Sequence, residues 1–542
     1  MAPPPKRPGI LRSSAIFAAL TFVSRLMGLA RDLVVTAKLG ASLTPAADAY
    51  NTMLAFPNLF RRIFAEGAFA AAFVPAYARK LKADGEVDAD QLASDALATL
   101  AAATIGLSVV CILAMPWLMY VINPGYADDP VKFKLAVLLT QISMGYLPCM
   151  AIGALLAGVL NARGRFIVSG AFPIVLNVVM LAAIWPTTDP IEGAKAASVA
   201  VLVSGLLQAG LLYWGARKSG ASIHFAVPKL TPEIKRLIAL AIPGTIAASA
   251  TQINIFISMM LASLMDGARS WLAVADRLYQ LPLGLIGVAI GVALLPRLAQ
   301  ALSEGDDGDA QATTDQAVVF AMALTLPAAA ALMAMPFFLI DAMFTRDMFT
   351  VVDARFTAQA LFHYGWGVPA FVLVRVLSPA FFARQDTKTP MRYALASVGV
   401  NIVAGLGLFF TIGFQGIAAA TSIAAWLNVA LLVWTLRRRG YYVPAPRAWS
   451  KLFRVLLASV AMGAFCWFAQ AYRPLIEGPL GAVTSGHAKE LAIVLVSGVG
   501  VLIYPLLVFA FGGVTPAEAR AALRRPVRKP GGQEPPPPTD AI

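Results

Sequence analysis

The chain has 542 residues, of which 59% are hydrophobic and 13% are charged, and its formal net charge is +14. Soluble domains carry about 25% charged residues, so this composition excludes an ordinary soluble protein. A positive net charge can indicate a nucleic-acid partner. Here, however, the basic residues are concentrated in short segments between apolar stretches, which is the pattern of cytoplasmic loops. We therefore expect an integral membrane protein with membrane lipids around it and no nucleic-acid partner.

Apolar stretches long enough to cross the hydrocarbon layer recur along the whole chain. Because the bilayer core offers no water to the backbone, such stretches must be helices. The sequence predicts an all-α protein with fourteen spans, near residues 13–39, 46–80, 92–122, 133–160, 167–187, 192–216, 234–262, 270–300, 314–344, 355–382, 390–412, 415–436, 451–472 and 490–512. The three cysteines, Cys111, Cys149 and Cys466, lie inside these apolar stretches, so we expect packing residues rather than a disulfide framework.

Basic residues cluster in alternate loops, for example at 79–82, 217–236 and 437–439. If both termini are cytoplasmic, these clusters all face the cytoplasm, as the positive-inside rule requires. We therefore predict a multi-pass protein of the bacterial inner membrane with both termini in the cytoplasm.

The two halves of the chain resemble each other. Trp214 matches Trp434, and Arg163 matches Arg384 at a spacing only one position longer, each arginine following a span. An even number of spans separates the copies, so both halves have the same orientation, with a substrate expected between them. We expect two six-helix lobes as a parallel repeat, followed by two more helices and a partly disordered cytoplasmic tail: residues 1–225, 226–445, 446–515 and 516–542.

Charged residues inside the first span are the first indication of a functional site. Arg25 and Asp32 are seven residues apart and share a helix face, whereas Arg31 points elsewhere. We expect Asp32 to neutralise Arg25 and to leave Arg31 as the freer cation.

The second span carries a similar group. Arg62 and Glu66 are four residues apart, the spacing of an intrahelical ion pair, which would leave Arg61 unpaired in its own helix. Pro57 removes a helix donor next to Asn58 and Arg61.

Four arginines, one of them in the eighth span, carry the functional prediction. A charge at the centre of a membrane helix costs about 2.5–3.5 kcal/mol, so four exposed to lipid would cost on the order of 10 kcal/mol. A shared polar cavity avoids this cost, and the forked donors of arginine suit phosphate oxygens. We therefore predict a transporter of an anionic, phosphorylated substrate. The expected substrate-binding residues are Arg25, Arg31, Arg61, Arg277 and Asn58, and the expected functional acids are Asp32, Asp48 and Glu66. For Asp48, near the outer start of its helix, a structural role is equally open.

The motifs Pro57-Asn-Leu-Phe-Arg-Arg-Ile-Phe-Ala-Glu-Gly67, Ala275-Asp-Arg-Leu278 and Ala383-Arg-Gln-Asp-Thr-Lys-Thr-Pro390 closely resemble the MurJ (MviN) family. These are bacterial lipid II flippases of the multidrug/oligosaccharidyl-lipid/polysaccharide exporter superfamily. The resemblance covers essentially the whole chain and implies a V-shaped bundle of two lobes with a central cationic cavity. It also implies that the four arginines bind substrate and that Asp48 and Glu66 are functionally important.

The resemblance implies movement of lipid II, an undecaprenyl-diphosphate-linked glycopeptide, to the periplasmic leaflet by alternating access, without enzymatic activity, cofactor or metal. The cell-wall synthesis machinery is a further candidate partner. Ser258 stands where some members have an acid near a sodium site, which speaks against sodium coupling and leaves the membrane potential or protons as the candidate driving forces. A flippase for another polyprenyl-diphosphate glycan is the nearest alternative. A cation antiporter would be repelled by the arginines, and a membrane enzyme would need clustered catalytic groups.

Overall fold

The computed structural model describes residues 10–62, 68–303, 306–484 and 486–513, and regular structure in these segments is helical apart from an isolated bridge between Arg346 and Phe349. Ten helical segments among the described residues are long and apolar enough to cross a membrane. The prediction of an all-α, multi-pass protein is therefore confirmed, whereas the number fourteen stays a prediction.

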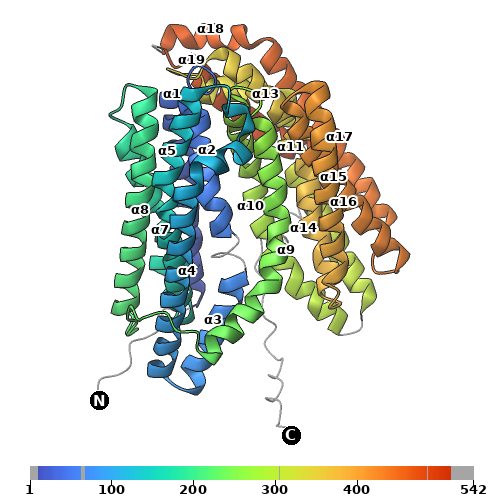
Figure 1. Cartoon of the computed structure of the whole chain (residues 1–542). Coiled ribbons are helices and arrows are strands. Elements are labelled where there is room, and N and C mark those ends of the chain that lie inside the picture. Colours follow the sequence, from blue (N-terminus) through green and yellow to red (C-terminus); the bar gives the residue numbers. More distant parts are fainter. Residues whose placement is uncertain (1–9, 63–67, 304–305, 485, 514–542) are drawn as a thin grey trace.

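The helices form two bundles that lie side by side (Figure 1). The first bundle consists of α1 (Ile10–Leu39), α2 (Pro45–Arg61), α3 (Ala68–Ala83), α4 (Glu86–Ile122), α5 (Pro130–Met144), α6 (Tyr146–Ala162), α7 (Phe166–Ile184) and α8 (Pro190–Lys218). The second consists of α9 (Pro232–Ala262), α10 (Ala268–Ser303), α11 (Asp307–Ala334), α12 (Pro336–Phe344), α13 (Val351–Gly365), α14 (Val368–Phe382), α15 (Lys388–Ile412) and α16 (Gln415–Arg438). The last helices of the described segments are α17 (Pro446–Ala471), which packs on α11, α18 (Arg473–Val483) and α19 (Ala488–Ala510).

Corresponding helices of the two bundles pack in the same way. α7 packs on α8 as α15 packs on α16, and α4 packs on α6 as α11 packs on α14. One ion pair also recurs at the end of each bundle: Arg163 lies 3.7 Å from Glu86, and Arg384 lies 3.3 Å from Asp307. Both members of the pair are displaced along the chain by the same offset, which is the one that separates Arg163 from Arg384 in the sequence.

A second contact recurs with the same offset. The backbone N–H of His224 donates to the Ser94 hydroxyl over 3.0 Å, and that of Ala445 donates to an Asp315 carboxylate oxygen over 3.1 Å. In both bundles this bond ties the segment after the last helix to a helix early in the bundle.

Prolines inside the helices explain several polar contacts between neighbouring helices. A proline has no N–H, so the carbonyl four residues earlier lacks its helical donor, and a membrane provides no water to replace it. The side-chain amide of Gln141 donates to the Ile112 carbonyl, four residues before Pro116, over 2.9 Å. Three other prolines show the same arrangement: Ser143 donates to Met53 (before Pro57), Ser108 to Met144 (before Pro148) and Tyr504 to Ala323 (before Pro327). The proline positions are thus tied to specific partners on other helices.

The start of α9 lies against the first bundle. Ile234 and Leu237 are buried in a core cluster with Phe73 and Tyr77 of α3, and Lys80 of α3 pairs with Glu233. The predicted lobe boundary at 225–226 stays a prediction, but the contacts place the first turns of α9 with the earlier helices. Cys111, Cys149 and Cys466 are free and buried, which confirms the prediction of packing residues.

Replacing Gln141 with Met removes the donor to the Ile112 carbonyl and keeps a side chain of similar size. We expect the free energy of unfolding in detergent to fall by about 1–3 kcal/mol, the cost of an unsatisfied buried polar group. In a Pro116→Ala background the backbone donor is restored, so the same substitution should cost much less. Equal losses in the two backgrounds would contradict this role of Gln141.

Candidate functional site

Arg25, Asp32, Asp48 and Arg277 lie along a seam where α1 and α2 of the first bundle meet α10 of the second. Asp48 of α2 is buried at the end of this seam where α10 begins. Its carboxylate accepts hydrogen bonds from Lys132 Nζ (3.0 Å), from the Gly267 backbone N–H (3.0 Å) and from the Ser270 hydroxyl (2.9 Å). Asp48 therefore joins the two bundles directly.

Further polar contacts between the bundles surround Asp48. Lys132 pairs with the exposed Asp266 at 2.7 Å, so one ammonium group links a carboxylate from each bundle. Additional bonds include those of Asn51 to Ser270 (3.0 Å), Ser42 to Asp353 (2.5 Å) and Arg269 to Asn123. Hydrogen bonds and ion pairs thus close this end of the seam.

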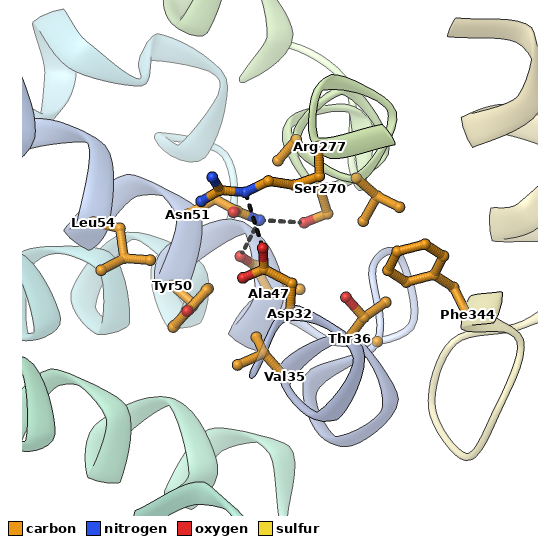
Figure 2. A pocket seen from close by; sticks show the side chains of 13 residues that line it. Asp32, Val35, Thr36, Ala47, Tyr50, Asn51, Leu54, Ser270, Arg277 and Phe344 are labelled. Carbon is orange, nitrogen blue, oxygen red and sulfur yellow. Dashed lines mark hydrogen bonds and ion pairs between the residues drawn. The ribbon is translucent and has the colours of Figure 1, made fainter. Parts of the chain in front are cut away.

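Asp32 of α1 is the central group of the seam (Figure 2). Its Oδ1 accepts two hydrogen bonds from Arg31, at 3.0 and 2.7 Å, and its Oδ2 lies 3.0 Å from Nε of Arg277 on α10. Arg31 is only 7% exposed, and its Nη1 also donates to Asn177 of α7 over 3.0 Å. One carboxylate therefore holds a buried arginine of its own helix and an arginine of the opposite bundle.

The predicted pairing in α1 is wrong. Asp32 binds Arg31 and Arg277 instead of Arg25, because the long side chain of Arg31 reaches back to its neighbour and its burial requires a compensating charge. Arg25 is exposed and makes no hydrogen bond or ion pair within the described part of the chain. Its guanidinium lies against Gly284 of α10: a Cβ built on that glycine would be 3.0 Å from Arg25 Cζ. Arg25, not Arg31, is the freer cation.

A small cavity with both polar and apolar lining residues lies beside Asp32. Its lining includes Asp32, Arg277, Asn51 and Tyr50, and its volume is about 70 Å³. The Tyr50 hydroxyl is buried and has no hydrogen-bond partner among the described residues. Ligand pockets usually measure about 300–1,000 Å³, so this cavity has room for a few water molecules only. The cavity itself therefore cannot hold a large substrate, although the Arg277 side chain beside it is 51% exposed.

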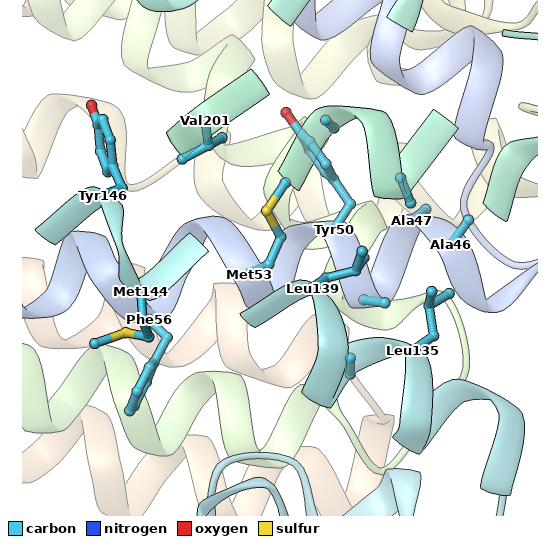
Figure 3. Close-up of a cluster of buried hydrophobic side chains, with 14 of the residues drawn as sticks. Ala46, Ala47, Tyr50, Met53, Phe56, Leu135, Leu139, Met144, Tyr146 and Val201 are labelled. Atoms are coloured by element: carbon cyan, nitrogen blue, oxygen red, sulfur yellow. The ribbon is translucent and has the colours of Figure 1, made fainter. Parts of the chain in front are cut away.

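A hydrophobic core behind the seam holds α2 in place (Figure 3). Tyr50, Met53 and Phe56 lie one turn apart on α2 and pack against residues of α5 and α8, such as Leu139 and Val201. The opposite face of α2 carries Asn51, which meets Ser270 of α10. The polar face of α2 is therefore positioned by its apolar face.

Three expected residues of the second span are only partly covered by the structure. Asn58 is half-buried, and its amide donates to the Leu54 carbonyl over 2.7 Å. Arg61 is the last residue of α2, but its side chain is outside the described part of the structure. Glu66 also lies outside the described residues, so the expected pair with Arg62 stays a prediction.

The sequence analysis missed three polar residues: Lys132 and Asn177, which contact residues of the seam, and Arg375 of α14. Lys132 lies just before the predicted span 133–160, and Asn177 appears in the sequence as a single amide in an apolar stretch. Arg375 lies inside the apolar segment Val372–Val376 of α14 and is exposed. The same test that selected Arg25 and Arg277, a charge inside an apolar span, would have selected Arg375.

Known proteins resemble this chain over most of its length. A family model described as "Lipid II flippase MurJ" matches residues 35–477. A "Probable lipid II flippase MurJ" of Rhizobium tropici is 38% identical over 511 residues, covering 93% of this chain and 95% of the relative. A "Lipid II flippase MurJ" of Burkholderia cenocepacia is 34% identical over 472 residues, covering 85% and 90%.

Two solved structures share the fold. One, titled "Lipid II flippase MurJ, inward closed conformation", superposes with a TM-score of 0.76 at 22% identity and covers 94% of this chain and all of its own. A multidrug resistance MATE family transporter of the MOP superfamily, in an inward-facing conformation, superposes with a TM-score of 0.64 at 16% identity and covers 79% and 98%.

Asp32→Asn removes the carboxylate that compensates the buried Arg31. We expect the free energy of unfolding to fall by about 3–5 kcal/mol, the usual cost of leaving a buried charge unpaired. Arg25→Ala should change it by less than about 1 kcal/mol, because Arg25 has no charged partner in the described segments. Chemical unfolding in detergent measures both values. Similar losses in the free energy of unfolding for the two variants would instead support an Arg25–Asp32 pair, which the distances in the structure contradict.

Proposed function

The chain belongs to the MurJ family of lipid II flippases, which are transporters and not enzymes, and from this premise we propose how its residues move lipid II from the cytoplasmic to the periplasmic leaflet. The observation that carries the proposal is the Arg31–Asp32–Arg277 contact, because it places paired cations on both bundles at one point of the seam.

The charges at this point suit the diphosphate of lipid II. Arg25, Arg31 and Arg277 are cations, and Asp32 is the one acid bonded among them in the described segments, so these four side chains have a net positive charge. A diphosphate linkage carries a negative charge on each phosphate, and arginine binds phosphate oxygens through paired N–H donors. In our proposal, Arg25 meets the diphosphate first, and Arg277 then exchanges Asp32 for a phosphate oxygen.

This exchange couples substrate binding to opening of the seam. Arg277 is half of an ion pair that joins the bundles, so its transfer to the substrate removes one link between them. The remaining links around Asp48 are hydrogen bonds and ion pairs, which polar groups can replace when water enters. Opening at that end would expose the bound headgroup to the periplasm, which is alternating access between two lobes.

We further propose fourteen transmembrane spans in two six-helix lobes plus α17 and α19. Adding α1, α2 with α3, α9 and α10 to the ten apolar spans gives fourteen, and all of these helices belong to the two bundles or to the last helices of the described segments. The ion pairs that recur at one constant offset along the chain support a parallel repeat. The positions of basic residues support an inner-membrane protein with both termini, including the tail after residue 515, in the cytoplasm.

The energy source is proposed to be the membrane potential or an ion gradient. The sequence has no phosphate-binding loop of the form G-x-x-x-x-G-K-[S/T]. Outward movement of an anion gains about 2.3 kcal/mol per charge per 100 mV of inside-negative potential. No cofactor is needed for this mechanism, and the cell-wall synthesis machinery remains a proposed partner.

The proposed function is tested in cells depleted of their own flippase and probed for lipid II in the outer leaflet. The wild-type chain should restore outer-leaflet lipid II, and Arg277→Ala should reduce it at least about tenfold, since a charge-assisted bond of about 1.5–3 kcal/mol is lost. Arg392→Ala, an exposed arginine of α15, is the matched control and should behave as wild type. Restoration of a different polyprenyl-diphosphate glycan, without lipid II, would favour that alternative substrate.

Seam opening is tested by a reversible lock. Asn51 and Ser270 are hydrogen-bonded across the seam at 3.0 Å, so cysteines at both positions should form a disulfide on oxidation, while the three native cysteines are buried. We expect the oxidised double variant to lose lipid II translocation and to regain it on reduction. Each single cysteine variant controls for the substitution itself. Full translocation by the cross-linked protein would rule out opening at this end.

A further inference from the structure

Gly284 lies on the face of α10 that meets α1. It follows Arg277 by seven residues, and Arg25 precedes Asp32 by seven, so each pair shares one face of its helix. The seam consequently has two successive levels. At one level Arg277 of α10 meets Asp32 of α1, and at the next Gly284 of α10 meets Arg25 of α1.

The guanidinium of Arg25 occupies the space that a side chain at position 284 would fill. A Cβ built on Gly284 would overlap Arg25 Nη1, and would lie 3.0 Å from Cζ and 3.4 Å from Nη2. These three atoms are the nearest neighbours of that Cβ, and all belong to the end of one arginine side chain. Close packing of helix backbones is therefore not what requires a glycine here.

Helical glycines elsewhere in the described segments provide a comparison. A Cβ built on Gly106, Gly210 or Gly399 would meet nothing within 4 Å. Gly220 and Gly512 also lie near an arginine, but both are turn residues with a positive φ, so the three helical glycines can serve as controls.

We propose that Gly284 is a positioning residue that seats the Arg25 guanidinium across the seam without neutralising it. The inference deepens the proposed function, on which it rests, by naming what holds the free cation where a diphosphate can bind it. An acid at this level would pair with Arg25, as Asp32 pairs with Arg277, and the substrate would then have to break that pair. A larger apolar residue would push the guanidinium away. Only glycine leaves the Arg25 guanidinium in this position and free to bind a phosphate oxygen.

Replacing Gly284 should disturb the position of the Arg25 guanidinium more than it disturbs the fold. The end of an arginine side chain can move by rotation about its χ angles, so an added methyl group displaces Arg25 and leaves α10 where it is. Alanine also favours a helix more than glycine does. Gly284→Ala should thus fold normally and still move the guanidinium.

The test measures lipid II binding to the purified full-length chain by native mass spectrometry. We expect Gly284→Ala to bind about tenfold more weakly, the loss of one charge-assisted hydrogen bond, and Arg25→Ala to show a similar loss. The Gly284→Ala/Arg25→Ala double variant should bind no more weakly than Arg25→Ala alone, because the glycine acts only through the arginine. Gly399→Ala should bind as wild type does. Additive losses in the double variant would overturn the proposal, since a merely structural glycine would give that result.

A second measurement reports the accessibility of the Arg25 guanidinium without any substrate. Phenylglyoxal modifies accessible guanidinium groups, and mass spectrometry of the peptide that contains Arg25 gives its rate. Gly284→Ala should speed this modification, and Gly399→Ala should leave it unchanged. If wild type fails to bind lipid II but the rate responds to Gly284→Ala, the seat holds and the proposed function fails. If wild type binds lipid II and Gly284→Ala alters neither affinity nor rate, the seat is refuted while the proposed function stands.

Discussion

The contact of one carboxylate, Asp32, with two arginines is the interaction on which the rest of the seam depends. Arg31 is buried in the first bundle, and its charge could not remain there without a partner. Because the same carboxylate also binds Arg277 of α10, the compensation of a buried charge and the closure of the seam are one interaction. Any group that competes with Asp32 for Arg277 therefore affects both the charge compensation and the closure of the seam. A phosphate oxygen is such a group.

Around Asp48 and Asp32 polar contacts join the bundles, while apolar contacts join them elsewhere: Leu29 and Leu33 of α1 pack against the core of the second bundle, and Ile234 of α9 is buried in the first. Within each bundle, apolar side chains such as Met53 and Leu139 are fully buried, and side-chain donors satisfy the carbonyls that prolines leave open. Across the seam, the contacts at Asp48 and Asp32 are polar. An apolar interior loses stability wherever it is opened, whereas polar contacts can be exchanged for water or for a polar ligand. At these two acids the contacts between the bundles can therefore be replaced without opening an apolar interior.

The arrangement of charge along α1 and α10 also separates two tasks. Asp32 and Arg277 hold the bundles together, and Arg25 remains without a charged partner in the described residues. A site in which every arginine was paired would bind an anion only at the cost of all its pairs. A site with none paired would not be stable while empty. The chain has both kinds of arginine, at successive levels of the seam.

The amino-acid sequence by itself determined the membrane class, the helical architecture, the constant offset between its two halves and the positive sign of the site. These follow from apolar length, from the exclusion of water and from the cost of charge in a bilayer, and all three are properties of composition and spacing. The pairing of the charges was decided only by the tertiary structure. Helical spacing predicted Arg25 with Asp32, but a long side chain such as that of Arg31 reaches its neighbour when burial demands it, and Arg277 arrives from a helix in the other half of the chain. Lys132 and Gly284 could not be assigned a role from the sequence for the same reason: what each does depends on the residue that the opposite bundle places against it.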